Sequence, residues 1–193
     1  MTDTRPTRRQ VLKLGAATGA AAGTLAVLGQ TGAQTGTSTA ADPARAGDLL
    51  IHQDGPNKGK AVKAAELKVG VAVWAIAVDP ATKKPRDPLK SGVVLVKLAS
   101  GKIKASSKPN AAGDVVAYSA ICTHQGCPAK ELGSLGQGKG NIICTCHGSI
   151  FDPGDNATVL GGPAPRRLAA LPIKADASGQ LVAKAAFIGK IGT

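Results

Sequence analysis

All four cysteines and two of the three histidines of the chain fall in two short stretches. The first reads Cys-Thr-His-Gln-Gly-Cys from Cys122 to Cys127, and the second reads Cys-Thr-Cys-His-Gly-Ser from Cys144 to Ser149. Within each stretch a thiol and an imidazole stand two or three positions apart, so one tight loop would aim both at the same small site. The spacing therefore predicts a metal centre that two loops build together.

The number of ligands indicates which metal centre this is. Six soft or borderline ligands are too many for one tetrahedral metal, which takes four. Two thiolates and two imidazoles suit a binuclear iron–sulfur centre, in which one iron binds the thiolates and the other binds the imidazoles. Two cysteines would be left over, one in each stretch, and an oxidising compartment would join them. The alternative is a structural zinc site, which would use four of the six ligands and leave a stray pair.

The two stretches match the Rieske motif, C-x-H-x-G-C followed by C-x-C-H-G-S, and the chain resembles the Rieske 2Fe-2S proteins. The resemblance covers about residues 114–175 and is only loose over residues 42–113. Residues 161–166, Gly-Gly-Pro-Ala-Pro-Arg, resemble the proline loop that covers the cluster in that family. The resemblance implies one 2Fe-2S cluster as the cofactor.

By position in the motif, the resemblance also assigns the cluster ligands. Cys122 and Cys144 would bind one iron, and His124 and His147 would bind the other. Ser149 occupies the position at which the family's serine donates a hydrogen bond to a bridging sulfide. These assignments make the site an electron-transfer centre and leave no other catalytic residue to name.

Two further features follow from the same resemblance, and one histidine lies outside it. The resemblance implies a disulfide between Cys127 and Cys146. Phe151 stands where high-potential members carry tyrosine, whose hydroxyl bonds a ligand thiolate, so the highest potentials of the family are not expected here. His52 lies outside both stretches and is interpreted as an ordinary surface histidine.

Imidazole ligation determines the charge of such a site. An oxidised cluster with two thiolates and two neutral imidazoles carries no net charge, whereas four thiolates would make it doubly negative. An electron adds more readily to the neutral site, so imidazole ligation raises the potential to roughly −150 to +300 mV. Reduction also strengthens proton binding at the outer ring nitrogens of His124 and His147, which couples electron uptake to proton uptake.

The rest of the chain favours an all-β fold. Short apolar or alternating runs recur with turn signals between them, which is typical of an antiparallel β sandwich. The resemblance adds a cluster-binding subdomain formed by two ligand loops and the proline loop. One or two helical turns are expected over residues 61–68. The expected strands are residues 49–52, 71–78, 93–98, 115–120, 141–144, 157–160, 168–174 and 180–188.

The first forty residues are interpreted as a targeting segment. Residues 7–13, Thr-Arg-Arg-Gln-Val-Leu-Lys, resemble a twin-arginine export signal. The apolar run over residues 14–28 is shorter than the roughly 20 residues of a good membrane span, which favours a signal h-region over a stable anchor. The expected location is the periplasm or the outer face of the cell membrane, with an uncleaved, membrane-associated anchor as the alternative.

This interpretation divides the chain into three parts. Residues 1–40 form the twin-arginine signal or N-terminal anchor, and residues 41–48 form a linker. Residues 49–193 form the Rieske 2Fe-2S domain, whose cluster-binding part lies at about residues 114–166.

The composition restricts the partners. The net charge is +12, and aromatic residues make up only 2% of the chain. So few aromatic side chains leave little for stacking against bases, which argues against nucleic acid. The basic surface is either a solvated lysine-rich face or a docking face for an acidic protein or an anionic membrane.

Three redox functions fit the motif, each as an electron-transfer subunit rather than a catalyst alone. The favoured one is the Rieske subunit of a quinol–cytochrome c oxidoreductase, which passes electrons from quinol to a c-type cytochrome beside a cytochrome b. The second is the small subunit of an arsenite-oxidase-like molybdoenzyme with a molybdopterin large subunit. The third is a free-standing exported electron carrier, and a non-redox zinc-binding module is the remote alternative. Dioxygenase-type Rieske ferredoxins lack the extra cysteine pair and stay in the cytoplasm.

Overall fold

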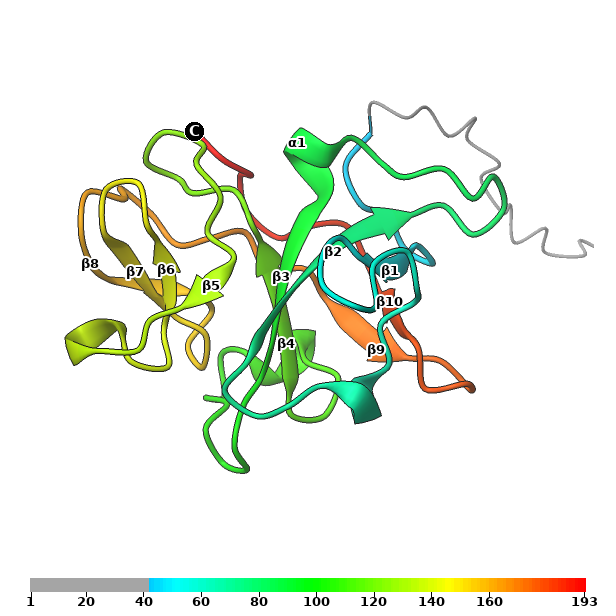
Figure 1. Ribbon diagram of the computed structural model, residues 1–193, viewed down its shortest axis with the longest axis horizontal. Helices are drawn as coiled ribbons and strands as arrows, with labels where there is room; N and C mark the ends of the chain where they lie inside the picture. The colour runs from blue at the N-terminus through cyan, green and yellow to red at the C-terminus, as the bar shows by residue number, and fades with distance from the viewer. Residues whose placement is uncertain (1–41) are drawn as a thin grey trace, which may run out of the picture. The chain divides into compact units, whose positions relative to one another are not determined.

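The computed structural model describes residues 42–193, which are built from short strands and helical turns (Figure 1). The first five strands are β1 (Leu49–His52), β2 (Ala72–Val78), β3 (Gly92–Lys97), β4 (Val115–Ser119) and β5 (Glu131–Leu132). The others are β6 (Ile142–Cys144), β7 (Ser149–Asp152), β8 (Thr158–Gly161), β9 (Ile173–Ala175) and β10 (Leu181–Ala183). The helical turns are α1 (Pro88–Ser91) and three 3₁₀ turns, η1 (Ala64–Glu66), η2 (Lys108–Asn110) and η3 (Gly136–Gly138).

The strands form two antiparallel sheets. A six-stranded sheet has the order β4-β3-β2-β1-β10-β9, and a four-stranded sheet has the order β5-β6-β7-β8. In Figure 1 the small sheet lies to one side of β3 and β4, and β1, β9 and β10 lie to the other. The expected all-β antiparallel architecture is confirmed.

Strand β3, which lies between β4 and β2, packs against the core on both faces of the larger sheet. Its residues Val93 to Val96 are all fully buried, and they alternate between two hydrophobic clusters. Val94 and Val96 pack in the cluster that also contains Cys122 and Cys144, whereas Val93 and Leu95 pack in the other. Successive side chains of a strand point to opposite faces, so this apolar run supports the metal centre on one side only.

Tyr118 on β4 connects the larger sheet to the smaller one. Its hydroxyl donates to the carbonyl of Pro153, just after β7, at 2.7 Å. Burial raises the pKa of Tyr118 to about 12, so the phenol keeps its proton and remains a donor at physiological pH. The two sheets are thereby held together next to the place where β4 leads into the first cysteine stretch.

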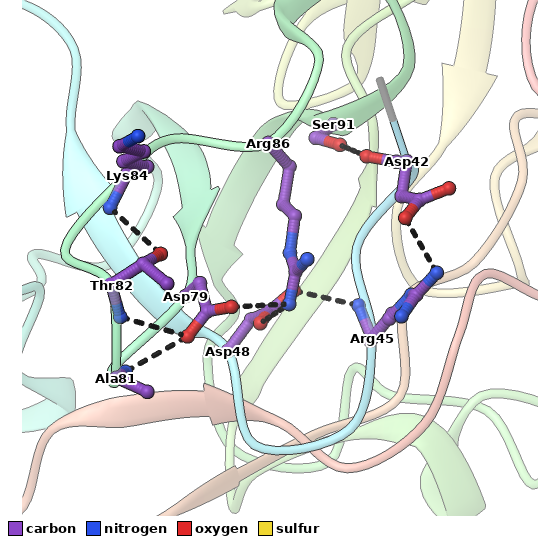
Figure 2. Close-up of polar contacts among 9 residues, drawn as sticks. All are labelled: Asp42, Arg45, Asp48, Asp79, Ala81, Thr82, Lys84, Arg86 and Ser91. Carbon is purple, nitrogen blue, oxygen red and sulfur yellow. Dashed lines mark hydrogen bonds and ion pairs between the residues drawn. The ribbon is translucent and has the colours of Figure 1, made fainter. Parts of the chain in front are cut away.

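Arg86 lies between two carboxylates at one end of the β1–β2 pair (Figure 2). Because Leu49 pairs with Val78, Asp48 and Asp79 come next on the neighbouring strands. Arg86 donates from Nε and Nη2 to the two oxygens of Asp48 at 2.9 and 2.7 Å, and Nη2 lies 3.4 Å from Asp79 Oδ2. The hydrogen bonds to Asp48 raise the pKa of Arg86. This buried arginine therefore neutralises one of two carboxylates that the strand register brings together.

The strand predictions differ from the structure in a few places. Strand β1 has the expected bounds, and η1 lies within the helical turn expected over residues 61–68. Strands β5 and β7 and the helix α1 were not expected. The strand expected over residues 168–174 is regular only from Ile173, because Pro172 has no N–H to donate to a ladder.

The targeting segment predicted for residues 1–40 lies outside the described residues. Within residues 42–193, no helix is both long enough and apolar enough to cross a membrane. In the stretch predicted as a linker, Ala44 and Asp48 are buried. The predicted division into signal, linker and domain stays a prediction.

Candidate metal centre

The two cysteine stretches form two loops that we call ligand loop 1 (residues 121–128) and ligand loop 2 (residues 144–149). Loop 1 closes on itself, because the N–H of Cys122 donates to the carbonyl of Cys127 at 2.8 Å. In loop 2, Cys144 on β6 pairs directly with Ser149 on β7, so the intervening residues form the tip of a hairpin. Gly148 has φ of 76° there, a left-handed conformation that glycine adopts without strain.

The cysteines separate into a free pair and a bonded pair. Cys122 and Cys144 are free and buried, with exposed fractions of 0% and 1%. Cys127 and Cys146 form a disulfide between the two loops, with their Cα atoms 6.5 Å apart. The structure thus contains the disulfide that the family resemblance implied. It places Cys144 beside the bridge, because the sulfur atoms of Cys127, Cys144 and Cys146 lie within 4.8 Å of one another.

The free thiols are buried together. Burial raises the pKa of Cys144, and a hydrogen bond with the Cys122 side chain raises it further, while the backbone groups of Cys146 and His147 act in the opposite direction. Without a metal the thiol form is therefore favoured at Cys144. Metal binding must displace thiol protons, as thiolate ligation generally does.

The two histidines of the ligand loops lie against each other. The rings of His124 and His147 meet edge to face with their centroids 4.8 Å apart. Nδ1 of His124 is buried and has no hydrogen-bond partner among the described residues. A buried ring nitrogen without a partner is costly unless a ligand occupies it. Two buried thiols, an orphaned imidazole nitrogen and a second imidazole beside it fit the donor set of a Rieske cluster.

The proline loop, residues 161–166, packs backbone to backbone on ligand loop 2. A Cβ at Gly162 would lie 2.5 Å from the carbonyl of Gly148 and from Cα of Ser149, so only glycine fits. The N–H of Ala164 donates to Oγ of the fully buried Ser149 at 3.2 Å. In that bond the hydroxyl of Ser149 is only the acceptor, so its hydrogen is not used there. The hydrogen bond from Ser149 to a sulfide stays a prediction.

The proline loop also reaches ligand loop 1. The hydroxyl of Thr123 donates to the carbonyl of Arg166 at 2.6 Å. Sequence reasoning did not single out either residue, although Thr123 stands between two predicted ligands and Arg166 ends the proline motif. Each of the three loops is thus connected to the other two: loop 1 to loop 2 by the disulfide, and the proline loop to each of them by a hydrogen bond.

The match to known proteins agrees with this geometry. The model of the Rieske [2Fe-2S] domain matches residues 75–172, about half of the chain and both ligand loops. The chain belongs to the Rieske [2Fe-2S] domain family. Its cofactor is accordingly a Rieske 2Fe-2S cluster, and the assignment of individual ligands stays a prediction.

Three curated Rieske proteins illustrate the similarity. A protein provisionally named respiratory nitrate reductase subunit Rieske, from Haloferax mediterranei, is 42% identical over 76 residues, which are 39% of this chain and 32% of that protein. The cytochrome bc1 complex Rieske iron-sulfur subunit of Corynebacterium diphtheriae is 47% identical over 81 residues, 42% of this chain and 19% of that protein. The bc1 Rieske subunit of Streptomyces lividans is 29% identical over 153 residues, 76% of this chain and 85% of that protein. The chain thus spans less than a third of the length of the first two.

The interpretation of His52 as a surface histidine was wrong. His52 is the last residue of β1 and only 8% of it is exposed. Leu50, two positions earlier, is fully buried on the same face of the strand, because side chains two apart in a strand share a face. Burial lowers the pKa of His52. The burial of this strand alternates, but its sequence, Leu-Leu-Ile-His, does not, so no local signal indicated the face on which His52 lies.

The disulfide provides the first test of the site. Cys127→Ser is expected to leave the ligands in place but to free the two loops, because such a bridge stabilises a folded protein by about 2–4 kcal/mol. The cluster should assemble, release iron to a chelator faster than in the wild type, and show a lower potential. The double variant Cys127→Ser/Cys146→Ser controls for the stray thiol. Finding Cys127 and Cys146 as free thiols in the oxidised wild-type protein would contradict this role.

Proposed function

We propose that this protein is an exported electron carrier in which Cys122 and Cys144 bind one iron and His124 and His147 bind the other. The observation that carries the proposal is that the two loops joined by the disulfide hold two free buried thiols and two imidazoles in edge-to-face contact. When bound, a Rieske cluster supplies a one-electron redox centre with an imidazole-ligated iron.

The protein residues around the site would exclude water and hold protons. The buried thiols and the packed proline loop exclude water from the sulfur side of the site. His147 is exposed, so its outer ring nitrogen can hold a proton or donate a hydrogen bond to a partner. If the buried Nδ1 of His124 binds the iron, the Nε2 of the same ring would be the atom that holds the ring proton. A cluster with these two imidazole ligands can accept an electron and a proton together, or an electron alone.

The favoured complex is a quinol–cytochrome c oxidoreductase of the cytochrome bc type. Two of the three relatives described above are named as bc1 Rieske subunits, and the Streptomyces lividans subunit aligns over most of its length. The inter-loop disulfide, the proline loop and the N-terminal segment support the same assignment. In this role the protein would take electrons from quinol and pass them to a c-type cytochrome.

A second candidate is the small Rieske subunit of a molybdoenzyme, as in the arsenite-oxidase-like group. The observation that favours it is the similarity to a protein named as a nitrate reductase subunit. In this role no quinol would bind, and the partner would be a molybdopterin subunit. A free-standing exported carrier remains the third candidate.

Co-purification from native membranes and periplasm distinguishes these complexes. A tagged full-length chain that brings down a b-type haem supports the favoured proposal. A molybdenum-containing large subunit in its place supports the second candidate and contradicts the first. Recovery of the tagged chain alone from the periplasmic fraction supports the free-standing carrier.

The substitution Phe151→Tyr tests what sets the reduction potential of the site. Phe151 is fully buried in the same hydrophobic cluster as Cys122 and Cys144. In Phe151→Tyr the new hydroxyl is expected to donate to a ligand thiolate, by resemblance that of Cys122, and to favour the reduced state. A bond of about 1.5–3 kcal/mol in all would differ between redox states by roughly 1 kcal/mol, which raises a one-electron potential by about 40 mV.

Protein-film voltammetry of wild type and variant at one pH measures this shift. Phe151→Leu is the matched control, because it alters the ring without supplying a hydroxyl. An unchanged or lowered potential in Phe151→Tyr, with the spectrum intact, would show that the ring at 151 does not face a ligand sulfur.

A further inference from the structure

The segment from Gly189 to Thr193 crosses ligand loop 1. It follows Ile188, which exchanges two backbone hydrogen bonds with Ala170 at 2.7 and 3.0 Å. In Figure 1 the red end of the chain lies beside the yellow-green loop that follows β4. Gly192 packs there so closely that a Cβ on it would be 3.0 Å from Cγ2 of Ile121, the residue before the predicted ligand Cys122.

The contact between Gly192 and Ile121 lies at the edge of a small cavity. The cavity has a volume of about 320 Å³. Ligand loop 1 contributes Ile121 and Gly126 to its lining, and the crossing segment contributes Ile191, Gly192 and Thr193. No ladder of strand pairing connects the two segments, so their position depends on a few side-chain contacts.

Arg166 supplies the polar contact that holds the crossing segment. Its Nη2 donates to the carbonyl of Gly192, while its own carbonyl accepts the hydroxyl of Thr123. Nε of Arg166 is buried without a hydrogen-bond partner among the described residues. A buried donor left unpaired costs stability. The bond to Gly192 is therefore made at some cost to the guanidinium. Thr123 lies between the predicted ligands Cys122 and His124, and Arg166 therefore links the ligands to Gly192.

We propose that Arg166 is a positioning residue for the metal centre, which straps residues 189–193 across ligand loop 1 and thereby fixes Thr123 between its two neighbouring ligands. The inference rests on the proposed ligand set. The strap packs against Ile121, at the start of loop 1, and shares the lining of the cavity with Gly126. It should slow the opening of loop 1 and the loss of iron.

The test compares Arg166→Met with Arg167→Met in the full chain. Arg167 is the next residue, is exposed and carries the same charge, so its substitution controls for the loss of one positive charge. Arg166→Met is expected to bind iron to the wild-type level but to release it to a chelator several-fold faster. Hydrogen–deuterium exchange should rise in residues 121–127 and 189–193 and stay unchanged in β2 and β3. Arg167→Met should match the wild type in both measurements.

A deletion of residues 189–193 tests the coupling. If Arg166 acts through the strap, the deletion should accelerate iron release to the same extent, and combining it with Arg166→Met should add nothing. Additive effects, exchange that rises throughout the domain, or equal behaviour of the two arginine variants would overturn the proposal. Because exchange is also measured on metal-free protein, the strap is tested separately from the ligand set, whose failure would instead appear as a lack of iron in the wild type.

Discussion

Replacing any one of the four predicted ligands with alanine is expected to abolish cluster binding. Each change removes one bond from a four-point attachment and leaves one iron with a single protein donor. Iron content and the visible spectrum of the purified variants should fall to background. The four variants are Cys122→Ala, His124→Ala, Cys144→Ala and His147→Ala.

His52 offers a matched control for this series. It is a buried histidine outside both ligand loops, so His52→Gln removes an imidazole without removing a ligand. We expect it to keep the full iron content. Full iron and the native spectrum in any one of the four ligand variants would show that the assignment of that residue is wrong.

The second large effect is expected from Arg86→Met. The change leaves the carboxylates of Asp48 and Asp79 adjacent, buried and without their shared cation. Removing one partner of a buried ion pair typically costs about 3–5 kcal/mol. Urea denaturation at pH 7 should show this loss in the free energy of unfolding.

Arg45→Met is the control for this prediction. Arg45 bonds to Asp42 at 2.6 Å, but its side chain is 43% exposed, and exposed pairs contribute only about 0–1 kcal/mol. The variant should therefore remain close to wild type. If Arg86→Met lost no more stability than Arg45→Met, the buried network of Figure 2 would not be the determinant of stability that its geometry indicates.

The metal centre could be predicted from sequence because its predicted ligands lie close together in the chain. Each ligand loop carries its thiol and imidazole within a few residues, and only the pairing of the two loops requires the fold. The disulfide between Cys127 and Cys146 then followed from the family motif and is present in the structure. Strands with sustained apolar or alternating patterns, such as β1 and β3, were predicted for the same reason.

The missed features depend on distant contacts. Strand β7 begins at Ser149, inside the motif, where Gly148 and Ser149 read as a loop; it becomes a strand by pairing with β6. Strand β5 has two residues, too few to show a period. The bond between Arg86 and Asp48 joins residues 38 positions apart, and nothing near either residue indicates the other. The link from Arg166 to Gly192 was missed for the same reason.

Metal analysis combined with pulsed electron paramagnetic resonance of the reduced, aerobically purified protein tests the central claim most directly. The account predicts two irons and two acid-labile sulfides per chain, and a paramagnetic reduced state coupled to the nitrogens of two imidazoles. It also predicts that His124→Ala and His147→Ala lose this signal. One zinc per chain with no paramagnetic signal, or an iron–sulfur signal without nitrogen coupling, would contradict it.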